Sequence, residues 1–289
     1  MEIAIHLGAH CTDGDRLLRV LGDNRPALLE RGVAVPLPGR ARPAIRQAIQ
    51  AMQGATDAAA EAAQADLLDA LLGDADADRV VLSYEGFLGP YARVLHGGRL
   101  YAEATARARL LLSIFRGHEV SFHMAIRNPA TWVPAVYEAS TMEDFAAFAA
   151  EAPQDALRWI PPLRDLAATG APVTAWCNED LPLIWPDVLR GVAGSEAPLR
   201  GEDAILREVM NAGGFARLET YLRDNPPPSA VHWRRVATAF LAKYAEESVT
   251  VEEIDQPGWT EEVVAGLTEA YERELPAIEA LDGVRFLQP

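Results

Sequence analysis

Lysine is almost absent from this chain of 289 residues. Lys243 is the only one, and every other basic side chain is an arginine. Acidic residues outnumber basic ones by 42 to 26, which gives a formal net charge of −16. Nucleic-acid-binding domains usually have a basic face, and anionic membrane surfaces attract basic segments. The charge therefore argues against both a nucleic acid and a membrane surface as the partner.

Cysteines are few and long apolar runs are missing. Cys11 and Cys177 are the only two cysteines, too few for the disulfide framework of a small secreted protein. Both follow predicted strands and could be neighbours, but we expect two reduced thiols. No apolar run of 18 residues predicts a transmembrane helix, and no basic segment followed by an apolar one predicts a signal peptide. We therefore expect a cytoplasmic protein.

Short apolar runs alternate with longer segments of helical periodicity. Runs of four to eight apolar residues predict strands, and apolar residues three or four positions apart predict helices. The alternation predicts an α/β fold in which helices flank a parallel sheet. Strands are expected at residues 3–7, 32–36, 79–83, 119–127, 173–177 and 283–287, and the main helices at 13–31, 43–72, 101–115, 153–169 and over most of the C-terminal remainder.

The segments that follow the predicted strands are the first place to look for a site. In parallel α/β sheets, ligands bind beyond the carboxyl ends of the strands. Residues 8–15 form a glycine turn between a strand and a helix, and a helix N-terminus favours an anion. This turn has no lysine, however, and it carries Asp13 and Asp15. Each carboxylate would repel a phosphate at ~4–6 Å by roughly 1 to a few kcal/mol.

The order and spacing of these segments resemble the bacterial sulfotransferase family, P-loop-related enzymes that transfer a sulfuryl group from PAPS to a hydroxyl. Ser83-Tyr84-Glu85 is similar to the family's S-x-E, and Arg127-Asn128-Pro129 to its R-[DN]-P. The resemblance covers most of about the first 190 residues. The family's loop has the pattern G-x-H-K-T-G-T-T-S, and the aligned positions here are Gly8, Ala9, His10, Cys11, Thr12, Asp13, Gly14, Asp15 and Arg16.

The resemblance implies a role for each aligned position. The loop amides would hold the phosphosulfate, and Arg127 together with position 135 would hold the second phosphate of the donor. Glu85 would be the base that deprotonates the acceptor hydroxyl. The chain departs from the family at the lysine, which Cys11 replaces, at the Gly/Thr run of the loop, where residues 13–16 differ, and at the serine, which Ala135 replaces. A thiol cannot supply the positive charge of a lysine.

Several of these residues also have explanations that need no ligand. Asp13 and Asp15 can cap a helix or complement its dipole in the first turn. Glu85 can cap a helix or pair with an arginine such as Arg127. His123 lies within an apolar strand, where a buried and hydrogen-bonded histidine is the simpler interpretation. His6, His10, Cys11, Asp13 and Asp15 are metal-ligand types at close spacing, but they match no zinc signature, and we expect no metal.

Three functions stay open at this point. The first is a divergent sulfotransferase that uses PAPS and a small-molecule, glycan or peptide acceptor. The second is a non-catalytic sulfotransferase-like protein that has lost PAPS binding and holds a carbohydrate, a peptide or a protein in the same cleft. The third is a P-loop kinase, which needs a lysine and a magnesium-binding hydroxyl that this loop lacks. We expect a single domain over residues 1–289, with an α/β core at about 1–195 and a helical elaboration at about 196–280.

Overall fold

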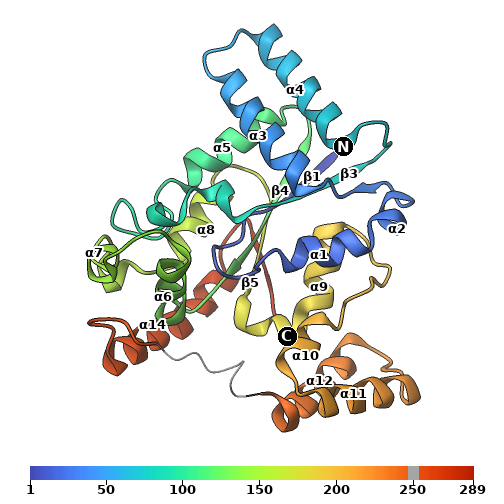
Figure 1. Ribbon diagram of the computed structural model, residues 1–289, viewed down its shortest axis with the longest axis vertical. Coiled ribbons are helices and arrows are strands. Elements are labelled where there is room, and N and C mark those ends of the chain that lie inside the picture. Colours follow the sequence, from blue (N-terminus) through green and yellow to red (C-terminus); the bar gives the residue numbers. More distant parts are fainter. Residues whose placement is uncertain (247–253) are drawn as a thin grey trace.

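The computed structural model describes residues 1–246 and 254–289. At its centre is a six-stranded sheet with the strand order β2-β3-β1-β4-β5-β6 (Figure 1). Every neighbouring pair is parallel, so the predicted α/β fold with a parallel sheet flanked by helices is confirmed. The strands are β1 (Glu2–His6), β2 (Val33–Ala34), β3 (Arg79–Ser83), β4 (Glu119–Ile126), β5 (Val173–Cys177) and β6 (Val284–Leu287).

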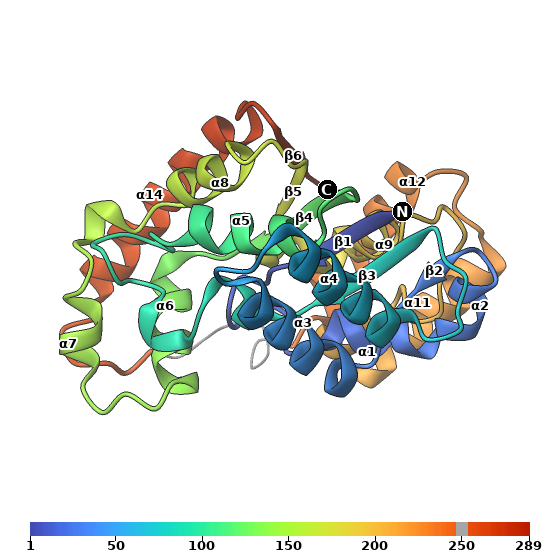
Figure 2. The same cartoon turned by 90° about the horizontal axis from the view of Figure 1, so that it is seen from above.

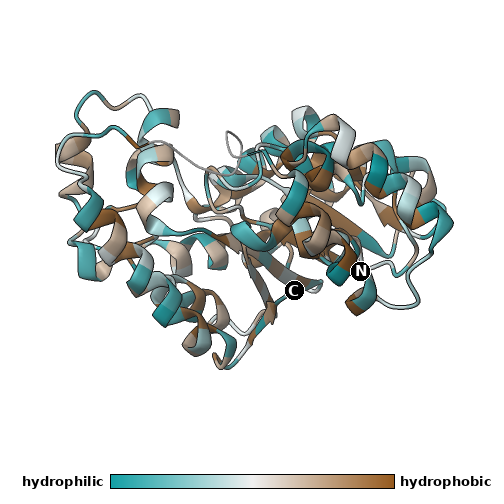
Figure 3. Cartoon of the chain, turned by 90° about the horizontal axis from the view of Figure 1, so that it is seen from below, coloured by the Kyte–Doolittle hydropathy of each residue, from teal (hydrophilic) through white to brown (hydrophobic). Residues whose placement is uncertain are grey.

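Alternate residues of the strands pack into two apolar layers, one on each face of the sheet. In β1, Ile3 and Ile5 join one layer while Ala4 joins the other, as the two-residue period of a strand requires. Hydrophobic residues are accordingly concentrated on the strands and the inward sides of the helices (Figure 3). The first layer includes residues of α3 (Pro38–Met52), α4 (Asp57–Leu72), α5 (Ala104–Ile114), α6 (Pro129–Ala139), α7 (Phe145–Ala149), α8 (Ile160–Ala167) and α14 (Glu261–Glu279), and the second residues of α1 (Arg16–Asp23), α2 (Arg25–Leu29) and α9 (Leu181–Ala193).

Two predicted helical segments are divided in the structure. The Ala-rich stretch 43–72 forms a pair of packed helices, α3 and α4, which projects from the sheet (Figure 1). The chain turns between them where Gly54 adopts a φ of 71°, and the Thr56 hydroxyl then caps α4 by accepting the Ala59 amide at 3.4 Å. The predicted helix 13–31 is interrupted at Asn24, which separates α1 from α2.

The C-terminal helices go to two different places. α10 (Ala204–Val209), α11 (Ala212–Asp224) and α12 (Ala230–Tyr244) surround a small apolar cluster of their own. The predicted linker 224–229 connects α11 to α12. α14 instead packs against α6 and the main core through Leu267, Tyr271 and Ile278. Residues 247–253, which belong to the predicted helical elaboration, lie outside the described residues.

The molecule is elongated in the view from above, with α6 and α7 at one end and α2 at the other (Figure 2). β1, β3 and β4 lie between these two ends (Figure 2). Among residues 1–246 and 254–289, no helix has both the length and the apolar character needed to cross a bilayer.

Candidate functional site

The register of β1 and β3 brings Glu85 to the glycine turn. His6 lies opposite Ser83 in this parallel pair, and His6 Nδ1 is 2.8 Å from Ser83 Oγ. Two residues beyond this pair, Gly8 packs directly against Glu85. A Cβ atom at Gly8, whose φ is 98°, would lie only 3.1 Å from the Cβ of Glu85. Glycine at position 8 therefore allows the approach that any larger residue would hinder.

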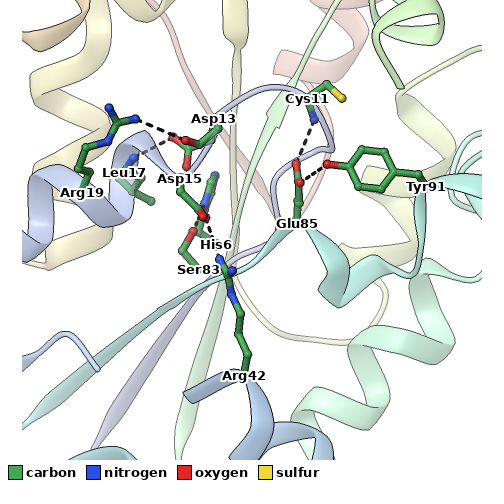
Figure 4. A network of polar contacts seen from close by, with 11 residues as sticks. His6, Cys11, Asp13, Asp15, Leu17, Arg19, Arg42, Ser83, Glu85 and Tyr91 are labelled. Atoms are coloured by element: carbon green, nitrogen blue, oxygen red, sulfur yellow. Dashed lines mark hydrogen bonds and ion pairs between the residues drawn. The ribbon is translucent and has the colours of Figure 1, made fainter. Parts of the chain in front are cut away.

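The Glu85 carboxylate is hydrogen-bonded to the loop. Its Oε2 accepts the backbone amide of Cys11 at 3.1 Å, and its Oε1 accepts the hydroxyl of Tyr91 (Figure 4). Glu85 begins the short helix η1 (Glu85–Leu88), and Tyr91 begins η2 (Tyr91–Arg93). An external anion that bound the Cys11 amide would have to displace this carboxylate. The sequence pointed to Glu85 but gave no sign of Tyr91.

Several backbone amides at the start of this turn have partners within the chain. Those of Leu7 and Ala9 extend the pairing of β1 with β4, since they donate to the carbonyls of His123 and Ala125 at 2.8 and 3.0 Å. The His10 amide donates to the Tyr101 hydroxyl at 3.0 Å. The amides of Ala9, His10 and Cys11 are thus already used by the protein itself.

His10 is fixed as a neutral side chain behind the loop. Its Nδ1 lies 2.7 Å from the Tyr101 hydroxyl, and its Nε2 lies 3.0 Å from the Gly89 carbonyl. A carbonyl only accepts, so Nε2 carries the proton and Nδ1 accepts from Tyr101. Burial lowers the pKa of His10, which agrees with this neutral form. Trp132 completes the support by donating from Nε1 to the His10 carbonyl at 2.7 Å.

Cys11, Arg127 and Ala135 meet at the loop, although they are far apart in the sequence. The Cys11 thiol donates to the Ala135 carbonyl at 3.4 Å, and Arg127 Nη1 donates to the Cys11 carbonyl at 2.7 Å. Arg127 Nε also donates to Thr131 Oγ1 at 3.2 Å. Burial, together with the charge of Glu85, raises the pKa of Cys11 to about 12. The side chain at position 11 is therefore an uncharged thiol at neutral pH.

The second cysteine lies in a different environment. Cys177 Sγ is 3.2 Å from the hydroxyl of Tyr271 on α14, and burial raises the Cys177 pKa to about 12. Both cysteines are free thiols, as the sequence led us to expect.

The two loop aspartates bind groups of the protein. Asp13 Oδ1 accepts the Leu17 amide at 2.9 Å and so caps the first turn of α1, while Asp15 pairs with Arg42 of α3 at 2.7 Å (Figure 4). Arg16 pairs with Glu208 of α10 at 2.9 Å. Thr12 Oγ1 donates to the Ala9 carbonyl, and Gly14 is exposed with a φ of 57°.

Asp13 is expected to make the stability of the fold depend on pH. Burial raises its pKa above the ordinary value, an effect larger than the opposing influence of His6 and of the Leu17 amide. A carboxyl group with a raised folded-state pKa stabilises the fold fully only below its unfolded pKa of about 3.9, and that contribution is lost as the pH rises through the folded pKa. Asp13 therefore contributes less to the stability of the fold as the pH rises from acid values.

We expect Asp13→Asn to raise the melting temperature at pH 7 by a few degrees, because an amide keeps an acceptor for the Leu17 N–H without the cost of a buried charge. The gain should shrink as the pH falls and should vanish near pH 3, where the carboxyl group is protonated in both states. Thermal unfolding followed by circular dichroism at several pH values measures this difference. Asp66→Asn, an exposed change in the middle of α4, is the control. A gain that is equal at pH 3 and pH 7 would contradict the account.

A cavity of about 640 Å³ opens beside Glu85, between α3, η1 and α5. His10, Glu85 and Tyr91 contribute to its lining from the loop side. Three arginines that were not predicted as site residues lie in its wall: Arg42, Arg46 and Arg107. A signal was present, because Arg42 and Arg46 are four residues apart and so share one face of a helix. A second cavity, of about 560 Å³, lies near Glu2 and Glu119 at the amino ends of β1 and β4, whereas the loop follows the carboxyl end of β1.

The other candidate residues have structural partners. His123 is buried in β4, its Nε2 lies 3.3 Å from Ser121 Oγ, and burial lowers its pKa to about 3. Within residues 1–246 and 254–289, no three His, Cys, Asp or Glu side chains form a group that could hold a metal ion.

No protein-family model, no curated protein and no solved structure matches the chain. The resemblance to sulfotransferases therefore stays a prediction from the sequence motifs.

Proposed function

We propose that this chain is a sulfotransferase-like binding protein that does not use PAPS and that holds an organic ligand in the cavity beside Glu85. The main support is the hydrogen bond of 3.1 Å from the Cys11 amide to Glu85 Oε2. A carboxylate of the chain thus takes the position in which the family's loop binds a donor anion, and no lysine is present to compensate for it.

The residues at the donor-binding positions do not fit PAPS. Two unit charges at ~5 Å repel by about 3 kcal/mol at an effective dielectric constant of 20, so Glu85 alone would weaken the binding of a phosphosulfate considerably. Cys11 is neutral, and Ala135 has no hydroxyl for the second phosphate of the donor. Arg16 is engaged with Glu208. Arg127 has the charge of a phosphate ligand, but its guanidinium already holds the loop carbonyl of Cys11.

The cavity gives the same region a binding function that does not need a donor. Its volume of about 640 Å³ lies in the range of sites for small organic ligands, which is about 300–1,000 Å³. Its lining combines an apolar part with charged and polar side chains that could fix the orientation of a ligand. Glu85 borders both the loop and the cavity.

Equilibrium dialysis with radiolabelled PAPS, followed by an assay for sulfate transfer to phenols, glycans and tyrosine peptides, tests this function. We expect no retention of PAPS at millimolar concentration and no sulfated product. Sulfuryl transfer from PAPS is the alternative function. Retention of the donor together with a sulfated acceptor would establish it and would overturn the proposal.

A further inference from the structure

The cavity beside Glu85 has an apolar wall. Ile45 and Ile49 contribute to it from α3, one helical turn apart, and Leu111 contributes from α5 on the opposite side. Leu110, which also lines the cavity, keeps 37% of its surface exposed, an unusual degree for a leucine in this fold. An apolar ligand body placed here would remove such surface from water, which is favourable.

Basic and amide side chains occur beside this apolar wall. Arg42, Arg46 and Arg107 line the cavity together with Gln50 and Gln53, whereas Glu85 is the only carboxylate in the lining. This excess of positive charge contrasts with the net charge of −16 for the whole chain. A local basic group on an acidic protein attracts anions selectively, because the remaining surface repels them.

Two of the three arginines already have partners, and the third does not. Arg42 pairs with Asp15 and stacks over the ring of Tyr84 at 4.5 Å, and Arg107 pairs with Glu103 at 3.2 Å. Arg46 has no ion pair among the residues that the structure describes. Its guanidinium is an exposed donor at the cavity, with five N–H groups in a planar fork that suits a carboxylate, a sulfate or a phosphate.

We propose that this cavity binds a small organic anion, with its apolar body against Ile45, Ile49 and Leu111 and its acidic head at Arg46 and Arg107. This inference rests on the proposed binding function and names the chemical class of the ligand. The head group is a carboxylate, a sulfate or a phosphate, since all three present paired oxygens to a guanidinium. This binding does not require the turn at residues 8–15, because none of the five residues that would contact the ligand belongs to that turn.

Naphthalene-2-sulfonate and naphthalene-2-sulfonamide form a matched pair of probes. Both carry the same aromatic body, but only the sulfonate has a charge at neutral pH. We expect the sulfonate to bind the purified protein at least ten times more tightly than the sulfonamide in fluorescence titrations. Equal affinity, or no binding of either probe at millimolar concentration, would overturn the inference.

Arginine substitutions locate the binding. Arg46→Gln combined with Arg107→Gln should weaken sulfonate binding at least tenfold and leave sulfonamide binding unchanged. Arg109→Gln is the matched control, because Arg109 is an exposed arginine on α5 that does not line the cavity. Ile49→Arg should weaken both probes by placing a charge in the apolar wall. Circular dichroism verifies folding, and sulfonate binding that survives the double substitution would contradict the proposal.

The two proposals fail in different ways. Retention of PAPS by the wild type would end the proposed function, whether or not the sulfonate binds. Loss of the preference for the sulfonate would end only the assignment of an anionic ligand. If PAPS itself bound in this cavity, the Arg46→Gln and Arg107→Gln changes would release it, whereas binding at the loop would not depend on them.

Discussion

Replacing Trp132 with alanine is expected to destabilise the protein by about 3–5 kcal/mol, as truncation of a fully buried tryptophan generally does. Trp132 has no exposed surface, and its ring packs edge-on against Trp159 with centroids 5.1 Å apart. Its Nε1 also donates to the His10 carbonyl at 2.7 Å. The substitution therefore leaves a cavity in the core and removes a support of the loop.

Trp132→Phe separates these two contributions. Phenylalanine keeps much of the packing but leaves the buried His10 carbonyl without this donor, which typically costs about 1–3 kcal/mol. Urea unfolding at neutral pH measures both variants. We expect the alanine variant to lose clearly more stability than the phenylalanine variant. A loss below about 1 kcal/mol for Trp132→Ala would show that the aromatic support of the loop is not as described.

Glu85→Gln is expected to strengthen the binding of adenosine bisphosphate, the desulfated product of PAPS, by at least tenfold. The amide oxygen can still accept the Cys11 N–H, so the turn should keep its shape, while the negative charge is lost. Removing a repulsion of about 3 kcal/mol at ~5 Å could give up to two orders of magnitude in affinity. Thermal shift measured over a series of ligand concentrations gives the dissociation constants.

Glu30→Gln is the control for this change. Glu30 is an exposed carboxylate at the end of α2, just before β2 begins. It therefore lies on the amino side of the sheet, whereas the loop follows the carboxyl end of β1. It alters the net charge by the same amount without touching the site. An equal gain in both variants would mean that long-range charge, and not the Glu85 carboxylate at the Cys11 amide, controls anion binding.

The strands were predictable because their signal is local. Arg79–Ser83 was predicted with its observed bounds, since Val80, Val81 and Leu82 are apolar and stand between polar neighbours. The division of residues 43–72 was also readable in principle, because Gly54 and the capping Thr56 mark a turn. The division was not predicted because the sequence is rich in alanine on both sides of the turn, which favours one continuous helix.

The contact between Glu85 and Cys11 could not be read from the sequence alone. It requires β1 to lie beside β3 in the register that pairs His6 with Ser83, which is a property of the whole sheet. It also requires Gly8, whose missing side chain lets Glu85 approach. The packing of α14 against the main core was not predictable either. Helical periodicity indicates that the face with Leu267 and Tyr271 is buried, but it does not specify the surface against which that face packs.

The central claim is that a carboxylate of the chain fills the anion position of the loop. The most direct test is a calorimetric titration of the wild-type protein, at low salt, with PAPS and with adenosine bisphosphate. We predict no heat of binding for either ligand up to millimolar concentration. Micromolar binding of both would show that arginines or loop amides have replaced the missing lysine, and it would contradict the account.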